Sequence, residues 1–382
     1  MSVLLTGATG FLGCRLLREL LARGEENITV LGRGTPDELR SRVEAAVQWL
    51  DSPALAPGTL ASVRYVSSDL LQPDLGLDVQ ERARITKDLT TLWHCAALIL
   101  LEGDPAPLHH ANVIGTRRVL QLANEAPGAR VLHVSTAYVA GQRSTGHIME
   151  DDLRDTGGFQ IPYEQSKHTA ERMLRAWASS GHRDVTVFRP SLLVTDRPIP
   201  QGLPGQPTDL LLRIVEHVVN SRPDHAATLP APVHTPRRTK ETPAAALQYR
   251  LQGDPLGSLN MLQADYAAHA MVLAASRTTP APGVRTMHVT HPKNVTFATV
   301  AAAVETRFPG LKVTMVPTLP HPTSLEKLAG AFAVNPLVYS THRRTYDRTN
   351  LLAALGGLPD PQPVDLAYLT RAFGCAPAAV AE

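Results

Sequence analysis

Short apolar runs alternate with helical patterns along the first half of the chain. The runs predict strands at residues 3–5, 28–31, 63–66, 91–95, 130–134 and 185–188. Between them, apolar residues recur at helical spacing, which predicts helices at residues 14–23, 37–50, 83–88, 112–124 and 164–179. Short apolar strands that alternate with helices are typical of a parallel sheet covered on both faces. We therefore predict an α/β fold built on a doubly wound parallel sheet.

The pattern changes after Arg189. Proline and glycine become frequent at residues 197–207, and a second proline-rich segment runs over 222–243. Between these segments, residues 209–220 form an apolar helical pattern that is too short for a membrane span. Its apolar positions indicate core or a substrate wall, and they are Leu210, Leu211, Ile214, Val215 and Val218. A helix at 265–276 and a strand at 286–290 then resume the alternation.

A glycine-rich turn lies between the first predicted strand and the first predicted helix. Gly7 allows a tight turn, Gly10 lets backbone N–H groups approach a pyrophosphate, and Gly13 lets the helix pack closely on the strand. Strand, turn and helix follow in the order that a dinucleotide-binding site requires, so the sheet is predicted to be of the Rossmann type. The cofactor-binding residues expected here are Thr6, Gly7, Thr9, Gly10, Phe11, Leu12 and Gly13.

These patterns predict two domains. Residues 1–190, with returning segments near 255–290, are expected to form the NADP-binding Rossmann domain. Residues 191–254 and 291–382 are expected to form a smaller substrate-binding lobe. It would lie over the carboxyl edge of the sheet, where ligands bind in such folds.

Composition excludes several classes of partner. The 382 residues carry a formal net charge of +2, which gives no field that would select nucleic acid or an anionic membrane. The chain enters its first strand without a signal segment, so a cytoplasmic monomer or homodimer is expected. The three cysteines, Cys14, Cys95 and Cys375, lack metal-ligand spacing and are interpreted as reduced thiols, with no metal site.

Tyr163 and Lys167 lie four residues apart in a predicted helix, so they share one helical face. A tyrosine can protonate a carbonyl oxygen if its pKa falls well below the usual value near 10. A neighbouring ammonium group would lower that pKa and could also hold the ribose hydroxyls of a nicotinamide. Ser135 and Thr136 end the fifth predicted strand, where a hydroxyl could hydrogen-bond a substrate carbonyl.

Charge at the end of the second predicted strand indicates the cofactor. An NAD site needs an acidic residue there to bind the ribose hydroxyls. This chain has Arg33 instead, and no acid occurs before Asp37. The guanidinium of Arg33 could pair with a 2′-phosphate, and Arg40 or Arg42 on the next helix could add a second contact. NADPH is therefore the predicted cofactor, with NADH as the other possibility.

Several motifs together resemble the extended short-chain dehydrogenase/reductase superfamily. The resemblance covers roughly the first 200 residues, with a fainter match around 255–290. Within the superfamily, residues 68–77 and 259–266 are most similar to the thioester-reductase and fatty-acyl-reductase branch. The matching motifs lie at residues 6–13, 68–70, 94–97, 112–116, 134–141, 163–167 and 189–191.

The resemblance implies roles for individual residues. Tyr163 would be the acid or base, Lys167 its electrostatic partner and Thr136 the carbonyl-binding hydroxyl, with Ser135 as the alternate. Asn112 would organise the helix and the lysine environment, or else cap the helix N-terminus. Asp69 would hydrogen-bond the adenine. The remaining cofactor contacts would be Leu70 beside it, Ala96 and Ala97 along the adenosine path, and Pro190 and Ser191 bordering the nicotinamide.

The first functional hypothesis is an NADPH-dependent reductase of a carbonyl or acyl-thioester substrate, in secondary or lipid metabolism. A thioester would give an aldehyde, and a second hydride would give an alcohol. Because the chain contains no adenylation or carrier domain, the thioester is expected on a separate acyl carrier protein or on coenzyme A. Apolar segments near the expected pocket, at 99–101 and 192–194, favour an acyl or polyketide-like substrate.

Two other functions remain open at this point. A nucleotide-sugar epimerase or dehydratase would share the catalytic set and recycle a bound NAD. Arg33 and the absence of acids after Thr136 count against it, whereas Arg237 and Arg238 could bind its diphosphate. A non-catalytic dinucleotide sensor is the third possibility, and the intact Thr136, Tyr163 and Lys167 set argues against it.

Overall fold

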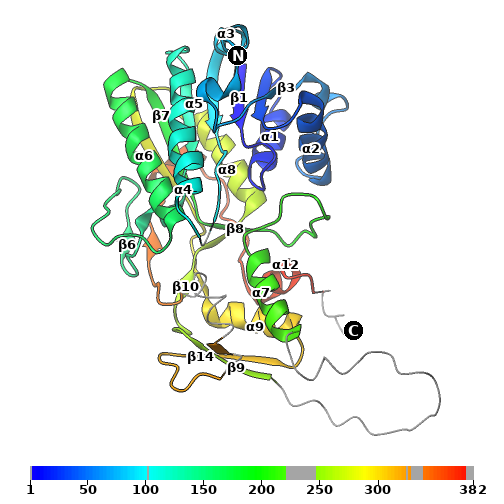
Figure 1. The fold of residues 1–382 in the computed structure, drawn as a ribbon, viewed down its shortest axis with the longest axis vertical. Coiled ribbons are helices and arrows are strands. Elements are labelled where there is room, and N and C mark those ends of the chain that lie inside the picture. Colours follow the sequence, from blue (N-terminus) through cyan, green and yellow to red (C-terminus); the bar gives the residue numbers. More distant parts are fainter. Residues whose placement is uncertain (1, 101–102, 221–246, 324–325, 328–338, 376–382) are drawn as a thin grey trace, which may run out of the picture.

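The computed structural model describes residues 2–100, 103–220, 247–323, 326–327 and 339–375 (Figure 1). Its upper body in this view is built on seven parallel strands in the order β12-β7-β5-β4-β1-β2-β3. The strands are β1 (Ser2–Thr6), β2 (Ile28–Gly32), β3 (Arg64–Ser67), β4 (Leu89–His94), β5 (Arg130–Val134), β7 (Asp184–Pro190) and β12 (Gly283–Val289). All six strands predicted in the first half are present, with ends that shift by at most two residues. The predicted doubly wound α/β fold is confirmed.

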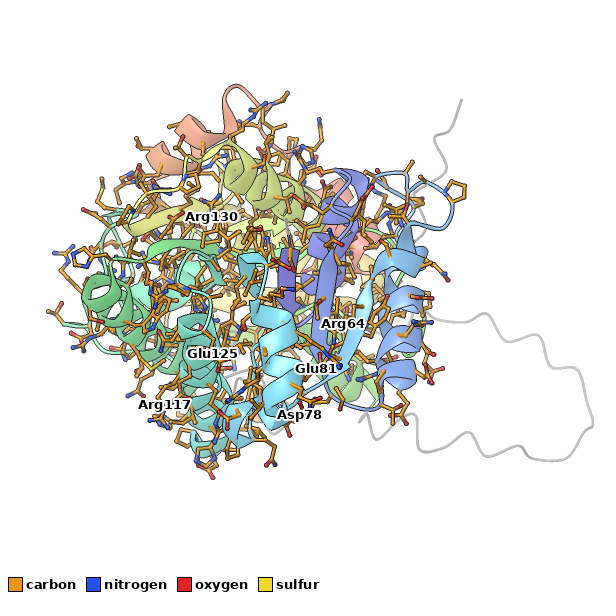
Figure 2. All side chains as sticks on the ribbon, turned by 90° about the horizontal axis from the view of Figure 1, so that it is seen from above. Arg64, Asp78, Glu81, Arg117, Glu125 and Arg130 are labelled. Carbon is orange, nitrogen blue, oxygen red and sulfur yellow. The ribbon has the colours of Figure 1, made fainter. Side chains whose placement is uncertain are left out.

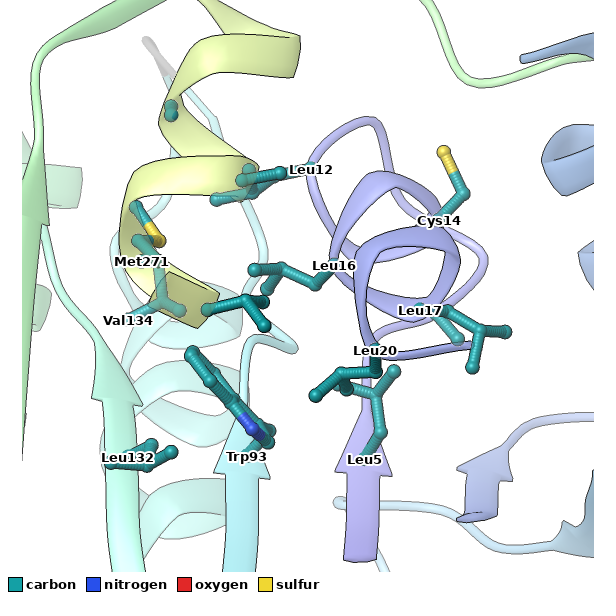
Figure 3. Close-up of a cluster of buried hydrophobic side chains, with 14 of the residues drawn as sticks. Leu5, Leu12, Cys14, Leu16, Leu17, Leu20, Trp93, Leu132, Val134 and Met271 are labelled. Carbon is teal, nitrogen blue, oxygen red and sulfur yellow. The ribbon is translucent and has the colours of Figure 1, made fainter. Parts of the chain in front are cut away.

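Helices cover both faces of this sheet and bury two separate apolar clusters. The first cluster receives residues from α1 (Gly13–Ala22), α2 (Pro36–Trp49), α8 (Ala264–Arg277) and α11 (Thr349–Leu355). The second receives residues from α3 (Val79–Thr86), α5 (Gly115–Asn124) and α6 (Pro162–Gly181). In Figure 3, Leu16 of α1, Met271 of α8 and Trp93 of β4 meet in the first cluster. Leu-rich stripes at helical spacing thus fix how α1 lies on the sheet.

Two predicted helices begin earlier than expected. The side chain of Asp78 accepts a hydrogen bond from Glu81 N at 2.7 Å, so α3 begins at Val79 and not at residue 83. The helix predicted at 112–124 begins at α4 (Ala106–Leu108), after Asp104, whose carboxylate accepts from Ala106 N at 2.9 Å. It continues through a π-helical turn, His109–Ile114, into α5.

The lower body in Figure 1 is smaller and has its own apolar core. Its strands form three short pairs. β8 (Leu192–Val194) pairs with β11 (Met261–Gln263), β9 (Leu247–Gln252) with β14 (Leu311–Val316), and β10 (Ser258–Leu259) with β13 (Val295–Thr296). The helices are α7 (Asp209–Asn220), α9 (Phe297–Arg307) and α12 (Leu366–Ala372). This body lies below the carboxyl ends of the seven parallel strands (Figure 1).

Part of the C-terminal segment returns to the upper body. β15 (Thr345–Tyr346) pairs with β6 (His147–Ile148), and α11 packs against α8 and β12. Residues 339–346 therefore lie close to the loop that follows β5, where the predicted catalytic residues are. The division into two domains stays a prediction, with α11 on the sheet side of any boundary.

The amino edge of the sheet, opposite the lower body, carries charged pairs at the surface. Figure 2 shows this edge from above, with Arg64 of β3 beside Glu81 of α3, and these two side chains form an ion pair. Pairs of this kind at a solvated edge contribute little to stability. In the part of the chain that the structure describes, no helix is long and apolar enough to cross a membrane.

Candidate functional site

One cavity of about 1050 Å³ joins the two bodies. Its lining begins at the glycine-rich turn after β1, passes the carboxyl ends of β2, β4, β5 and β7, and continues into the lower body. Such a volume is at the upper end of the range for a single small ligand. It therefore has room for a dinucleotide and a substrate together.

The glycine-rich turn has the backbone that the sequence predicts. Gly7 has a φ of +84°, and a Cβ there would lie 2.6 Å from Ala96 N. Gly10 N donates to Gly7 O at 2.9 Å, and a Cβ on Gly13 would collide with Gly7 O. Because the first-turn N–H groups of α1 lack partners within the helix, the turn fits a pyrophosphate. All seven residues predicted here, Thr6, Gly7, Thr9, Gly10, Phe11, Leu12 and Gly13, line the cavity.

Arg33 directly follows β2, and Arg42 on α2 bonds to its carbonyl. Arg33 is exposed and lines the cavity. Arg42 is not among the described lining residues, since its guanidinium donates to the carbonyl of Arg33 and its Nε to Glu38 O at 3.3 Å. Arg42 thus supports the loop that presents Arg33. The other predicted residues of this end, Asp69, Leu70, Ala96 and Ala97, all line the cavity.

Thr136, Tyr163 and Lys167 line the same cavity. Lys167 is 2% exposed, and its Nζ donates to Val134 O at 2.6 Å. Burial lowers the pKa of Lys167 to about 8. Burial also raises the pKa of Tyr163, contrary to the expected depression by the ammonium group. The direction is opposite to the expected one because desolvation of the buried phenol dominates, and the charges of Cys95 and Glu164 add to the rise.

Ser135 and Thr136 are adjacent but have different surroundings. Ser135 Oγ donates to the carboxylate of Glu171 at 3.0 Å. Glu171 is fully buried, and although burial opposes its ionisation, ion pairs with Arg189 and Arg175 hold its pKa below the usual value. The Oγ1 of Thr136 accepts from Tyr138 N at 3.2 Å and lies 3.5 Å from Pro190 O. Ser135 therefore belongs to a structural network, and Thr136 is the better candidate for a substrate contact.

Asn112 ties the loop after β4 to the helix that carries Tyr163. Its Oδ1 accepts from Leu98 N at 2.8 Å, and its Nδ2 donates to Leu98 O and to Ser166 Oγ, each at 2.9 Å. Asn112 lies within a π-helical turn and not before a helix, so the capping alternative is wrong. The bonds agree with the other alternative, in which it organises the helix around Lys167.

The segments on either side of the predicted nicotinamide position line the cavity only in part. Pro190 and Ser191 line it, as do Leu192 and Leu193, whereas Val194 is buried in the lower core. Ile99 is 55% exposed at the rim of the cavity, so it is not simply core. Leu101 lies outside the described residues, as do Arg237 and Arg238.

Sequence reasoning missed two aromatic residues at the cavity. The rings of Tyr138 and Tyr339 meet edge to face with centroids 5.1 Å apart, and both line the cavity. The Tyr339 hydroxyl donates to Oε1 of Glu164 at 2.7 Å, and burial raises the pKa of that carboxyl. No local pattern around Tyr339 indicates this contact, because it depends on the return of residues 339–346 to the upper body.

The sequence also missed a pair of buried histidines below the site. His94 and His133 are paired residues of β4 and β5, with ring centroids 5.3 Å apart. The ring of His94 is hydrogen-bonded to Thr6 at 2.8 Å and Thr116 at 3.0 Å. Burial lowers the pKa of His94 to about 3 and also lowers that of His133. Both rings are therefore neutral at physiological pH. The His94 ring links Thr6, at the start of the glycine-rich turn, to Thr116 of α5, whereas neither ring nitrogen of His133 has a hydrogen-bond partner among the described residues.

Comparison with known proteins agrees with this arrangement. The isonitrile lipopeptide synthase of Streptomyces coeruleorubidus is 34% identical over 190 residues, covering 49% of this chain and 13% of that protein. The L-2-aminoadipate reductase large subunit of Penicillium chrysogenum is 26% identical over 349 residues, covering 85% of this chain and 22% of that protein. The chain thus spans less than a quarter of the length of either relative.

A solved structure has the same fold over most of this chain. The terminal R domain of the myxalamid PKS-NRPS biosynthetic pathway superimposes with a TM-score of 0.73 at 24% identity. The alignment covers 97% of this chain and 89% of that one.

A family description covers the glycine-rich turn, the predicted catalytic residues and α7. The sequence model of the male sterility protein family, a family of NAD-binding domains, matches residues 5–221. The match supports a nicotinamide dinucleotide as the cofactor, and the resemblance stated from the motifs is confirmed. The chain belongs to the male sterility protein family of NAD-binding domains, in the thioester reductase branch of the extended short-chain dehydrogenases/reductases.

Proposed function

We propose that this chain is an NADPH-dependent reductase of acyl thioesters. The observation that carries the proposal is one continuous cavity, lined by Thr136, Tyr163 and Lys167 where a dinucleotide cleft meets an apolar chamber. A reductase of this kind needs a proton donor and an oxyanion contact between its two binding regions. The kinship with an aminoadipate reductase and with a lipopeptide synthase supports the same class of reaction.

The position of Arg33 supports NADPH over NADH. Its side chain is exposed at the cavity, directly after β2. A guanidinium binds a phosphate through paired hydrogen bonds, whereas an NAD site places an acid at this point of the fold. Asp69, which also lines the cavity at this end, is the proposed adenine contact.

The site residues suggest how the carbonyl is activated. Bound NADPH supplies a hydride to the thioester carbonyl carbon. The raised pKa keeps Tyr163 protonated at neutral pH, so its hydroxyl can donate to the carbonyl oxygen. Thr136 Oγ1 provides the second donor as negative charge develops on that oxygen. The ammonium of Lys167 stabilises the phenolate that remains and holds the ribose hydroxyls.

Hydride transfer and protonation would give a hemithioacetal. Its carbon–sulfur bond then breaks, the hydroxyl proton passes to the leaving sulfur, and an aldehyde and a free thiol result, while Tyr163 regains its proton from solvent. A second hydride would give an alcohol. The thioester would be presented by a carrier protein or as a coenzyme A ester. Both deliver an acyl group through the same type of arm.

The two other functions are less well supported. A nucleotide sugar needs cationic partners for its diphosphate, but the part of the lower body described here lines the cavity with apolar residues. Ala137 and Tyr138 follow Thr136, where a dehydratase would place acids. A sensor would not need the buried Lys167 beside Tyr163.

The test is NADPH oxidation against a panel of acyl-CoAs, long-chain aldehydes and cyclic ketones. The proposal expects oxidation with acyl-CoAs, release of coenzyme A and an aldehyde or alcohol product. If NADPH were oxidised only in the presence of ketones, the substrate would be a ketone and not an acyl thioester. Tightly retained NAD together with interconversion of sugar nucleotides would overturn the proposal.

A further inference from the structure

The part of the cavity in the lower body has walls from four elements. α9 contributes Phe297, Val300, Ala301 and Val304, which recur at the spacing of one helical face. α7 contributes Leu211 and Val215, β9 contributes Leu251, and β14 contributes Val313 and Met315. We call this region the acyl chamber.

Several chamber residues are apolar but only partly buried. Leu211, Val215, Leu251, Val313 and Met315 are half-exposed, although they line the cavity between elements of one lobe. On β14 their neighbours Lys312 and Thr314 are exposed, so the strand alternates between a cavity face and a solvent face. Apolar surface kept open inside a lobe indicates that an apolar ligand covers it.

The charged residues that line the cavity lie in one part of it. Among the described lining residues, the charged side chains are Arg33, Asp69, Asp104 and Lys167, and all come from the upper body. The polar side chains of the lower part are Gln206, which is already engaged, and Thr208, whose Oγ1 is buried without a hydrogen-bond partner among the described residues. The amide of Gln206 is bonded to Thr195 N at 2.9 Å and to Ala372 O at 3.0 Å. The polar end of a ligand therefore fits at Tyr163 and its apolar end fits the chamber.

The strand pair β9–β14 lies at the end of the lower body farthest from the seven-stranded sheet (Figure 1), and Leu251, Val313 and Met315 of this pair line the chamber. Met315 is paired with Leu251 in this parallel ladder, and Val313 lies one step before it on the same face. The tip of Met315 lies against Gly253, where an added Cβ would collide with it. Larger or smaller side chains at these positions would shorten or lengthen the chamber.

We propose that the acyl chamber binds the hydrocarbon tail of the substrate acyl group, and that Val313 and Met315 set the longest chain that fits. The inference rests on the proposed reductase function and names its substrate as a long apolar acyl group. Each methylene that enters the chamber strengthens binding about fourfold until the tail reaches β14.

The first test measures binding and turnover of saturated acyl-CoAs of increasing length by the wild-type protein. Binding without NADPH is followed by calorimetry, and turnover by NADPH oxidation. The proposal expects affinity and kcat/KM to rise with chain length and then stop rising. A length-independent profile in binding overturns the chamber. Length-dependent binding without any reduction would instead overturn the reductase function and leave the chamber standing.

Variants locate the closed end. Val313→Phe should lower kcat/KM for the longest accepted chains about tenfold or more and change short chains less than twofold. Met315→Ala should extend the accepted range. Thr314→Phe is the matched control, since Thr314 is the exposed neighbour on the same strand, and it should leave the profile unchanged. Equal effects of Val313→Phe on all lengths, with an unchanged optimum in Met315→Ala, contradict the assignment of the chamber's end.

Discussion

The ammonium group of Lys167 donates a hydrogen bond to the carbonyl oxygen of Val134 at 2.6 Å. This bond joins α6 to the last residue of β5, immediately before Ser135 and Thr136. Both partners are buried, so the bond fixes the lysine close to the position where a nicotinamide ribose would lie.

Activity should fall as the pH rises through the pKa of Lys167. Burial lowers that pKa to about 8, so the side chain is cationic below this pH and neutral above it. The neutral amine can no longer stabilise a phenolate, whereas Tyr163, whose pKa is raised, stays protonated over the same range. We expect kcat/KM for NADPH-dependent reduction to be level below about pH 7 and to decline above about pH 8. A profile that is flat or rises above this pH would show that Lys167 does not titrate in the working range. Thermal midpoints at each pH control for unfolding.

Thr136 and Ser135 should respond differently to alanine. Thr136→Ala removes the proposed contact to the carbonyl oxygen and should lower kcat by about a hundredfold, with little change in NADPH affinity. Ser135→Ala removes only a hydrogen bond to Glu171, so it should cost about 1 kcal/mol of stability and leave kcat within a few fold. Steady-state kinetics and thermal melts of both variants test this. A larger loss of kcat in Ser135→Ala than in Thr136→Ala would show that Ser135, and not Thr136, contacts the carbonyl oxygen.

Arg33 should determine the preference between the two dinucleotides. Arg33→Ala should weaken NADPH binding by about 1.5–3 kcal/mol, roughly ten- to hundredfold, and hardly affect NADH. Arg84→Ala is the control, because Arg84 is exposed on α3 and pairs with Glu81 at the amino edge of the sheet, away from the cavity. Fluorescence titration with both cofactors gives the ratio. Equal losses for NADPH and NADH in Arg33→Ala would remove the argument for a 2′-phosphate contact.

The ion pair between Glu171 and Arg189 should be essential for stability. Both side chains are fully buried and lie 2.6 Å apart. Glu171→Gln leaves a buried guanidinium without its charged partner, which should cost about 3–5 kcal/mol. Asp155→Asn removes an exposed pair with Arg172 and should cost less than about 1 kcal/mol. Chemical denaturation compares the two variants, and similar losses would show that burial of Glu171 does not matter.

Local patterns were sufficient to predict the sheet and the glycine-rich turn. Apolar runs marked the six strands of the first half, and spacing placed Tyr163 and Lys167 on one helix. No strand was predicted at residues 311–316, although Leu311, Val313 and Met315 of β14 alternate with polar residues. A two-residue period over six positions could have revealed it.

Other features depend on contacts between distant segments. The commitment of Ser135 to Glu171, the approach of Tyr339 to Glu164 and the raised pKa of Tyr163 all come from the packed structure. Local spacing does not show how far a side chain is removed from water. For that reason the sequence predicted a lowered pKa for Tyr163, whereas burial raises it. The two arginines could not be distinguished from sequence either. Only the fold shows that Arg33 lines the cavity and that Arg42 bonds to the Arg33 carbonyl.

The most direct test of the reductase function counts NADPH oxidised and thiol released from a long-chain acyl-CoA by the wild-type protein and by Tyr163→Phe. Thioester reduction predicts one NADPH per thiol if an aldehyde is the product and two if an alcohol is. Tyr163→Phe should bind NADPH nearly as well and lower both rates together by about a hundredfold or more. Thiol release without NADPH oxidation, or a Tyr163→Phe variant as fast as wild type, would contradict a reductase built on Tyr163.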